Sequence, residues 1–345
     1  MKITIIGAGH TGLSLAALLF EKQIPFLVYT RSAAKAAVWN EFPLQAKGAV
    51  TGSFKAKATT DLKKAAEFSD CYVISTPATA HKDILSSFLP LAKEGTRFLF
   101  LNGCWASLKG LRLCQKQSIR GMTMAETANQ PFLGVLAPDF RSVTVKAVKS
   151  EIAYYTSDDD PELSRLLHEI SPRMARLASP ASAALSQTNP IIHGAASLFN
   201  ITRIENGEDF LFFGRPMTKR VIAYMDACDQ ERLCIASALG LSLPSLLDTL
   251  NASWNEKKGT LFDALKENPS YQTVKGPSSL SFRYLSEDLP CGVEAMANLA
   301  DMLHVDAPHI TTLADMAALY LNVPRRPFLT PKDLALLKQI APIKA

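Results

Sequence analysis

The sequence predicts an α/β protein whose first half forms a doubly wound sheet and whose second half is all-helical. Over residues 1–156, short β-branched runs alternate with amphipathic stretches, the pattern of repeated strand–helix–strand units. After Ser186 strand signals nearly vanish and long helical patterns dominate. A length of 345 residues favours two domains, and a content of 48% hydrophobic and 20% charged residues is ordinary for a globular chain. We expect domains over residues 1–182 and 183–345.

The strands of the first half are predicted from short apolar runs. Ile3–Ile6 is continuously apolar, which is typical of a strand buried on both faces of a parallel sheet. Val143–Val148 and Ile152–Tyr155 are predicted to form a later antiparallel pair. The other expected strands cover Phe26–Tyr29, Cys71–Ile74 and Phe98–Leu101.

The helices are predicted from apolar spacing and from capping residues. Leu13–Phe20 has helical spacing, and Asp160 with Pro161 supplies an N-cap candidate and a proline suited to the first helical position. Pro180 lies near the expected domain boundary. In the second half, helices are expected over about 187–201, 218–239 and 292–303.

The net charge of +5 divides unevenly along the chain. Residues 1–150 carry a net charge of +10, and the remainder carries −5. The cationic residues of the basic half are scattered, without a basic helix or a zinc or RNA-binding signature, so we expect no nucleic-acid partner. A small bound polyanion explains the basic half better.

Neither the cysteines nor the apolar runs indicate an exported or membrane protein. The six cysteines include no C-x-x-C pair and no metal-ligand spacing. The N-terminus lacks a signal-peptide pattern, and no apolar run approaches the ~18–20 residues that span a bilayer. We predict a cytoplasmic protein with no bound metal and no membrane contact.

A glycine motif directly follows the first predicted strand. Gly7, Gly9 and Gly12 form G-x-G-x-x-G and open an apolar helix, and this context gives the motif its meaning. The first glycine permits a tight turn, the second lets the backbone approach a pyrophosphate, and the third lets the helix pack on the strand. Because free N–H groups at a helix start bind phosphates, we predict a Rossmann-type site that includes His10 and Thr11. A plain glycine-rich turn is the alternative.

The residues after the second predicted strand favour NADP over NAD. NAD-binding proteins usually place an acid here to hold the ribose 2′-hydroxyl, and this chain has Thr30 instead. Arg31, Ser32 and Lys35 follow, and a guanidinium can pair with a 2′-phosphate while hydroxyls donate to it. NADP(H) is therefore the predicted cofactor, with NAD less favoured. Alternatively, Arg31 and Lys35 only decorate a solvent-facing helix start.

A second cofactor contact is predicted where the strand at Cys71–Ile74 ends. Thr76 and Pro77 stand there, where the nicotinamide half of a dinucleotide usually crosses the sheet edge. His81 follows on the next helix, and a structural role is favoured for it over a catalytic one.

Three later segments combine residues suited to chemistry. Glu126 stands in a polar cluster within an otherwise apolar region, and Asn189 precedes His193 by about one helical turn. Arg283 and Asp288 lie within ten residues of one another, close to a Pro/Gly stop. A histidine, an acid and an arginine are the parts for proton transfer, its orienting partner and a carboxylate clamp.

Together with the glycine motif, these segments resemble the opine dehydrogenases, the octopine and nopaline dehydrogenase family, which includes enzymes that finish opine-type metallophores. The resemblance covers essentially the whole chain. It depends most on the Asn-Pro-x-x-His segment at Asn189–His193 and the Arg-Tyr-x-x-Glu-Asp-x-Pro-x-Gly segment at Arg283–Gly292. The family usually has proline directly after the histidine, where this chain has Gly194.

The resemblance implies a reaction and roles for particular residues. Members of the family reductively join an α-keto acid to the amino group of an amino acid with NAD(P)H, through an imine. His193 matches the catalytic histidine and Asp288 its carboxylate partner, which would hold the ring's tautomer. Arg283 matches the residue that grips a substrate carboxylate. Asn189 and Glu126 are further candidates for the nicotinamide or substrate pocket, and we expect the cleft between the domains.

Each of these roles has a structural alternative. Asp288 could be the N-cap of the following helix, and Glu287 competes with it as the partner of His193. Arg283 could form a structural ion pair with either acid. The sequence does not separate these possibilities.

Two other functions compete with the opine dehydrogenase interpretation. A two-domain reductase of the ketopantoate reductase or β-hydroxyacid dehydrogenase type would normally use a catalytic lysine, for which we find no convincing equivalent. A non-catalytic NADPH sensor would need the glycines but not His193. The keto acid and the amine are not predictable from sequence, and a homodimer is possible because related folds often form one.

Overall fold

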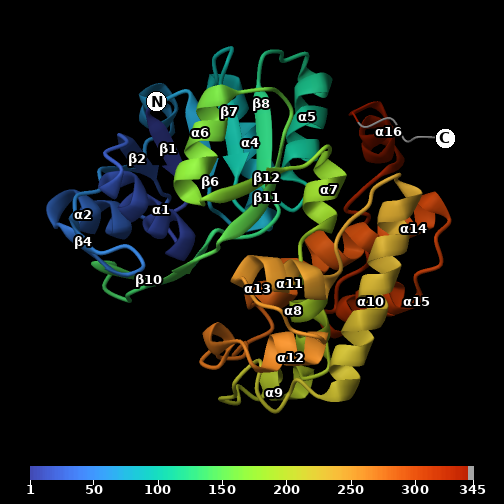
Figure 1. Ribbon diagram of the computed structural model, residues 1–345. Coiled ribbons are helices and arrows are strands. Elements are labelled where there is room, and N and C mark those ends of the chain that lie inside the picture. Colours follow the sequence, from blue (N-terminus) through green and yellow to red (C-terminus); the bar gives the residue numbers. More distant parts are fainter. Residues whose placement is uncertain (341–345) are drawn as a thin grey trace. The chain divides into compact units, whose positions relative to one another are not determined.

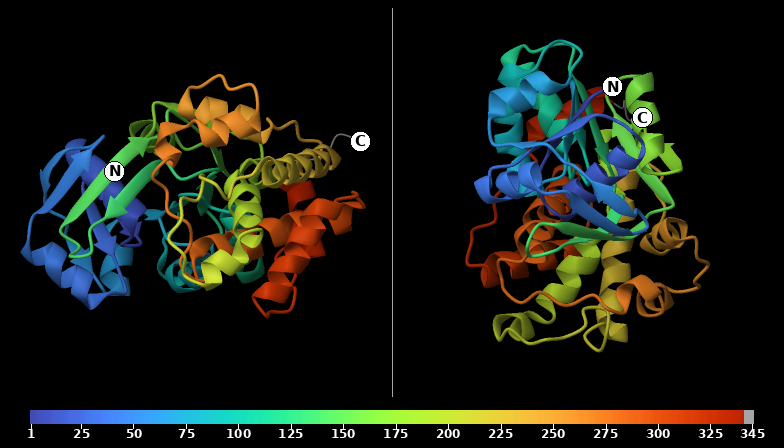
Figure 2. Two further views of the ribbon diagram at one scale, coloured as in Figure 1. Left: turned by 90° about the horizontal axis from the view of Figure 1, so that it is seen from below. Right: turned by 90° about the vertical axis from the view of Figure 1, so that its left-hand side faces the viewer.

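The computed structural model describes residues 1–340 and divides into two compact units (Figure 1). The first unit is Met1–Ala183 and the second begins at Ala184. The predicted domains, 1–182 and 183–345, differ from this division by one residue. The first unit runs from blue to light green in Figures 1 and 2, and the second continues to red.

An eight-stranded sheet forms the centre of the first unit, in the order β12-β11-β8-β7-β6-β1-β2-β5. The strands from β8 to β5 pair in parallel, whereas β11 pairs antiparallel with β8 and parallel with β12. The strand bounds are β1 Ile3–Ile6, β2 Phe26–Tyr29, β5 Ala58–Thr59, β6 Cys71–Ile74, β7 Arg97–Phe100, β8 Thr123–Thr127, β11 Glu151–Thr156 and β12 Arg173–Arg176.

Both faces of this sheet are buried under helices. Along β6, Cys71 and Val73 face one hydrophobic cluster, while Tyr72 and Ile74 face the other. Because successive side chains of a strand point to opposite faces, this alternation shows a sheet covered on both sides. The helices α1 His10–Glu21 and α6 Pro161–Ile170 supply one cluster, and α3 Leu62–Phe68, α4 His81–Phe88 and α5 Ala106–Gln117 supply the other.

A second sheet of four strands, in the order β4-β3-β10-β9, lies beside α1. It corrects one prediction. The expected antiparallel pair does not exist, because Val143–Val148 belongs to β10 in this sheet and Ile152–Tyr155 belongs to β11 in the large one. Two strands that sequence reasoning missed, β8 and β9, are their antiparallel partners. The bounds are β3 Leu44–Gly48, β4 Gly52–Phe54, β9 Phe132–Leu136 and β10 Ser142–Val148.

Side-chain caps mark the starts of two helices in this unit. The Asp160 side chain accepts hydrogen bonds from the backbone N–H groups of Glu162 and Leu163, and Pro161 occupies the first helical position of α6. The Ser32 side chain caps α2, Ala33–Glu41, in the same way.

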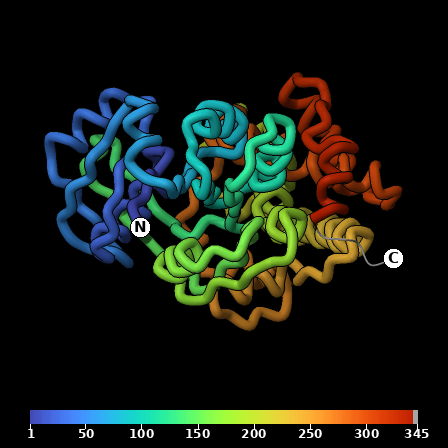
Figure 3. The backbone as a smooth tube through the Cα atoms, turned by 90° about the horizontal axis from the view of Figure 1, so that it is seen from above, coloured from blue at the N-terminus to red at the C-terminus, as the bar shows by residue number. Residues whose placement is uncertain are grey.

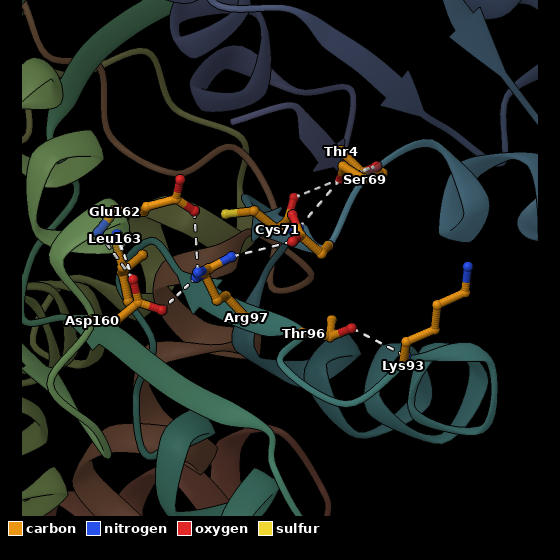
Figure 4. Close-up of polar contacts among 10 residues, drawn as sticks. Thr4, Ser69, Cys71, Lys93, Thr96, Arg97, Asp160, Glu162 and Leu163 are labelled. Atoms are coloured by element: carbon orange, nitrogen blue, oxygen red, sulfur yellow. Dashed lines mark hydrogen bonds and ion pairs between the residues drawn. The ribbon is translucent and has the colours of Figure 1, made fainter.

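Polar contacts also join the starting edges of the central strands (Figure 4). Arg97, at the start of β7, pairs with Asp160 at the cap of α6, with Glu162 at 3.2 Å and with Asp70 at 3.4 Å. In β1, the Thr4 hydroxyl lies 2.8 Å from that of Ser69. Burial of Asp160 raises its pKa, but bonds from backbone N–H groups and from Arg97 outweigh burial and lower the pKa overall. These contacts lie at the amino-terminal ends of the central strands, opposite to the carboxyl end of β1, which the glycine motif follows.

The second unit is built from helices (Figure 3). Within residues 184–340, the only strand-like pairing is one isolated bridge between Leu211 and Lys275. The predicted fold class, a Rossmann-type doubly wound sheet followed by an all-helical domain, is confirmed. The helix bounds are α7 Pro180–Leu185, which crosses the division, then α8 Asn189–Leu198, α9 Ile201–Glu205, α10 Lys219–Ala238, α11 Leu246–Trp254, α12 Leu261–Lys266, α13 Arg283–Ser286, α14 Glu294–Leu303, α15 Pro308–Tyr320 and α16 Pro331–Ile340.

No helix within the described range is both long enough and apolar enough to cross a bilayer.

The helix α10 buries an arginine. Arg232 is 1% exposed and donates to Asp229, to the carbonyl of Leu185 at 2.7 Å and to that of Pro244 at 2.8 Å. The pair therefore connects α10 to two other segments of its unit.

We expect Arg232→Leu to lower the free energy of unfolding by about 3–5 kcal/mol, because Asp229 would keep a buried and unpaired charge. Denaturant unfolding of the full chain measures this loss. The control is Arg220→Leu, which removes an exposed arginine from the same helix and should change the free energy by less than about 0.5 kcal/mol. Equal losses in the two variants would show that the buried pair stabilises the fold no more than an exposed arginine does.

Candidate active site

The glycine motif forms a tight turn between β1 and α1. Gly7 has φ +119°, and a Cβ atom at Gly12 would lie 2.0 Å from the carbonyl oxygen of Gly7, so neither position accepts another residue without a shift. A Cβ at Gly9 would have no protein atom within 4 Å. The backbone at Gly9, at the N-cap of α1, is therefore open to a ligand that approaches the helix N-terminus.

A cavity of about 390 Å³ lies against this turn, within the first unit. Gly7, Gly9, Thr30, Arg31 and Thr76 line it. The Thr76 hydroxyl is buried and has no hydrogen-bond partner in the described structure. Buried polar groups are normally paired, so an unpaired hydroxyl beside an open helix start fits a polar ligand such as a dinucleotide.

The residues predicted to select NADP all line this cavity, but their contacts differ. The Thr30 hydroxyl accepts from the backbone N–H of Ser32, whose own hydroxyl caps α2. Lys35 donates to the Ala8 carbonyl at 2.8 Å and lies over the Phe140 ring, and burial lowers its pKa. One Lys35 bond therefore holds the glycine turn itself. Arg31 is exposed at the end of β2.

Two predicted cofactor residues point elsewhere. His10 Nδ1 accepts from the backbone N–H of Leu136 at 2.7 Å, and the Thr11 hydroxyl donates to the Gln130 side chain at 3.1 Å. Both contacts link α1 to β9 and its preceding loop, and neither residue lines the cavity. Their side chains connect α1 to the smaller sheet and to the loop before β9, while their backbone N–H groups still belong to the helix start.

Where β6 ends, Thr76 and Pro77 both line the cavity as expected. His81, one turn further on, is buried, with Nε2 3.2 Å from the Thr76 carbonyl and its ring against Phe100. Burial lowers the pKa of His81 to about 4, so its ring is neutral near pH 7. This geometry gives His81 a structural role, in which it supports the segment at Thr76 that lines the cavity.

Glu126 lies in β8 and is fully buried within the first unit. Its carboxyl accepts from the Ser107 hydroxyl at 2.7 Å and from the Ala106 N–H at 3.1 Å, at the start of α5. Burial raises the pKa of Glu126 to about 7, although these bonds act to lower it. The side chain binds a helix start of its own unit, a placement that does not favour the predicted contact with substrate.

The raised pKa of Glu126 predicts a pH-dependent loss of stability. A folded pKa above the unfolded value means that this group's contribution is complete at about pH 4 and is lost as pH rises through about 7. Glu126→Gln cannot ionise, so its free energy of unfolding, measured in denaturant at pH 5 and pH 8, should change less with pH than that of the wild type. An unchanged pH dependence would contradict the assignment.

The second unit brings together the two residues predicted for proton transfer. His193 Nδ1 lies 2.7 Å from Asp288 Oδ2, although 95 positions separate the residues in sequence. The His193 side chain is 12% exposed and that of Asp288 4%. Asp288 begins a π-helical turn, Asp288–Val293, which precedes α14. The N-cap of α14 is Val293, and no side chain forms a capping hydrogen bond there. The alternative of Asp288 as an N-cap is therefore wrong.

Two glycines allow α8 to pack against this turn. A Cβ at Gly292 would lie 2.3 Å from Pro190 Cγ, and a Cβ at Gly194 would lie 2.9 Å from a methyl group of Leu289. Gly194 stands where opine dehydrogenases usually have proline. It packs against the turn that carries Asp288. Both glycines keep the backbones close enough for the His193–Asp288 contact.

Asn189 and Arg283 lie close in sequence to His193 and Asp288, respectively. Arg283 opens α13, and its Nε lies 3.4 Å from Glu287 Oε2, while its side chain is 40% exposed. Burial alone would lower the pKa of Arg283, but Glu287 and Asp288 raise it overall. Arg283 therefore forms its ion pair with Glu287, the acid that competes with Asp288 as the partner of His193. Asn189, half-buried at the start of α8, has no side-chain hydrogen bond to a described residue.

Sequence reasoning missed the aromatic surroundings of His193. The ring of Tyr284 stacks on it with centroids 3.7 Å apart, and Phe212 meets it edge-on at 5.9 Å. Tyr284 lies within the Arg283–Gly292 motif, and its place next to Arg283 was a signal for a role near the site. Phe212 lies in a loop with no pattern of its own.

Comparisons with known proteins agree with this arrangement. A family model described as NAD/NADP octopine/nopaline dehydrogenase, alpha-helical domain, matches residues 176–321, and one for the NAD-dependent glycerol-3-phosphate dehydrogenase N-terminus matches residues 2–138. The opine dehydrogenase of Arthrobacter sp. (strain 1C) is 24% identical over 90% of this chain and 88% of its own. Through its helical half and its full-length relatives, the chain is opine dehydrogenase-like.

Solved structures of the opine dehydrogenase type share the fold. An octopine dehydrogenase in complex with NADH and agmatine superposes with a TM-score of 0.78 at 18% identity, covering 93% of this chain and 90% of its own. A yersinopine dehydrogenase with NADP+ bound gives 0.75 at 15% identity, covering 99% and 98%. As an opine dehydrogenase-like enzyme, the protein is an NAD(P)-dependent dehydrogenase that acts on amino-group donors.

Proposed function

We propose that this opine dehydrogenase uses NADPH to join an α-keto acid to the amino group of an amino acid. Amine and ketone condense to an imine with loss of water. A hydride then adds to the imine carbon and a proton to the nitrogen, which gives a secondary amine with two carboxylate arms. The nicotinamide supplies the hydride, so the protein's own task is binding, orientation and proton transfer. The 2.7 Å contact between His193 and Asp288 carries the proposal.

His193 acts as the group that exchanges a proton with the substrate. Asp288 accepts a hydrogen bond from Nδ1–H, which fixes the tautomer and stabilises the imidazolium when the ring gains a proton. The second ring nitrogen, Nε2, is then the atom that exchanges the proton. A histidine suits this task because its ordinary pKa lies close to neutral pH.

Arg283 grips a substrate carboxylate in this proposal. Its Nε faces Glu287, and the planar guanidinium offers its two terminal nitrogens to the two oxygens of a carboxylate. The half-exposed side chain can reach a small anion without leaving the ion pair. Asn189 stays a further candidate for contacts with substrate, as predicted from sequence.

The glycine turn and its cavity fit the dinucleotide, and we propose NADPH as the preferred form. Gly7, Gly9 and Gly12 would hold the pyrophosphate at the start of α1. Arg31 would pair with the 2′-phosphate, since no acid is present at Thr30 to hold a 2′-hydroxyl. A cytoplasmic location and a homodimer also stay predictions.

The experiment follows NADPH consumption by purified protein with a pool of α-keto acids, with and without a pool of amino acids. Consumption only when both pools are present supports the proposal. Consumption with keto acids alone would identify a hydroxyacid reductase instead. Binding of NADPH without any consumption would favour the sensor and would weaken the role given to His193.

A further inference from the structure

The imidazole of His193 is held on its face as well as at its edge. Tyr284 stacks on the ring with an interplanar angle of 21° and a centroid distance of 3.7 Å. Phe212 meets His193 at 68° and also tilts against Tyr284 at 5.0 Å. The Tyr284 ring also meets the ring of Phe282 edge-on, with centroids 4.9 Å apart. The Tyr284 ring is thus fixed by two other aromatic rings before it meets the histidine.

The chain geometry makes this stack part of the proton-transfer pair. Tyr284 and Asp288 stand four residues apart, on α13 and the adjoining π-helical turn, and both contact the same ring of α8. Asp288 bonds the ring at one atom, Nδ1, and this hydrogen bond by itself still permits rotation about its own axis. A stacked neighbour removes this remaining freedom, because rotation would push the imidazole into the Tyr284 face.

We propose that Tyr284 is a positioning residue for His193, which fixes the imidazole plane and stabilises its protonated form through the aromatic face. The face of a phenol ring carries negative charge density and attracts a cation placed over it. The inference rests on the proposed role of His193 in proton transfer. Its first test does not depend on turnover.

The charged groups around His193 belong to the elements packed against it. Asp288 contacts the ring directly, and Arg283 and Glu287 stand beside Tyr284 on α13 and at its end. Burial raises the pKa of Tyr284 to about 12, so Tyr284 stays neutral between pH 5 and pH 9. A titration of His193 in this range therefore reports on the imidazole and not on a tyrosinate.

The test is an NMR titration of full-length protein with isotopically labelled histidine, in wild type, Tyr284→Leu and Tyr284→Phe. The chain has six histidines, and the His193 signal is assigned from its loss in His193→Gln. We expect Tyr284→Leu to lower the His193 pKa by about 0.5–1 unit, because the imidazolium loses the aromatic face. Tyr284→Phe keeps the face and should leave the pKa within about 0.2 unit of wild type.

Activity supplies the second readout. In Tyr284→Leu, kcat for reductive condensation should fall about 10–100-fold while the Kd of NADPH stays unchanged, since a small misplacement of a catalytic group costs rate. Tyr284→Phe should retain kcat within about threefold. If the wild type condenses nothing, the proposed function fails, yet the pKa shift of His193 still decides the inference.

A matched control removes another tyrosine that packs on a histidine. Tyr224 meets His309 edge-on at 5.2 Å, in the same unit. Tyr224→Leu should leave the His193 titration and kcat unchanged, whatever it does to the melting temperature. The inference is overturned if Tyr284→Leu shifts the His193 pKa no more than Tyr224→Leu does. It is also overturned if Tyr284→Phe behaves like Tyr284→Leu, because the hydroxyl and not the ring would then be responsible.

Discussion

Replacing His193 by alanine is expected to lower kcat for reductive condensation about 10³-fold, within the range of 10²–10⁴ that a positioned acid or base contributes. The Kd of NADPH should stay within about twofold, because the cavity beside the glycine turn is lined only by residues of the first unit. Steady-state kinetics and a fluorescence titration with NADPH measure the two effects. Loss of turnover with binding retained separates a proton-transfer residue from a structural one.

The control for this variant is His168→Ala. His168 is exposed on α6, and its Nδ1 lies 2.7 Å from the Ser164 carbonyl oxygen of the same helix. Its loss should change neither kcat nor the Kd of NADPH. If His193→Ala weakened NADPH as strongly as it lowered kcat, or left kcat near that of wild type, the assignment of His193 would be wrong.

Replacing Arg31 by alanine is expected to weaken NADPH about 10–100-fold and NADH less than about threefold. A hydrogen bond to a charged group contributes about 1.5–3 kcal/mol, and only NADPH carries the 2′-phosphate that Arg31 would bind. Isothermal titration of wild type and variant with each nucleotide gives the four Kd values. The ratio of the two losses, and not their size, tests the preference.

The matched control is Arg120→Ala, which removes an exposed arginine of the same unit outside the cavity. It should weaken both nucleotides equally and little, through net charge alone. Equal weakening of NADPH and NADH in Arg31→Ala would contradict the 2′-phosphate contact. Lys35 is a poorer target, because its bond to the Ala8 carbonyl means that its loss disturbs the glycine turn for both nucleotides.

The features that local chemistry dictates were predictable from sequence. The turn at Gly7–Gly12 needs glycine at φ +119° and at a 2.0 Å approach, so its pattern is visible without a fold. The cap of α6 at Asp160 and Pro161 is likewise local. The pairing of His193 with Asp288 came from the resemblance, since their 95-residue separation carries no signal of contact by itself.

What depends on distant partners was not predictable. The strand at Val143–Val148 is only two residues from Glu151, where the next strand begins, yet the chain pairs each with a different partner, β9 and β8. Glu126 was expected as a candidate for the nicotinamide or substrate pocket, because nothing in the sequence shows that its carboxyl meets the start of α5. Lys35 was expected to face the nucleotide, but the Ala8 carbonyl across the turn accepts one of its hydrogen bonds.

The central claim is tested most directly by the mass of the product formed from NADPH that carries two deuterium atoms at nicotinamide C4. With a defined keto acid and amino acid, we expect a product whose mass equals their sum less one oxygen, with one hydrogen replaced by deuterium. This product requires the imine and the hydride together. A deuterated hydroxyacid, with the amino acid recovered unchanged, would contradict the account.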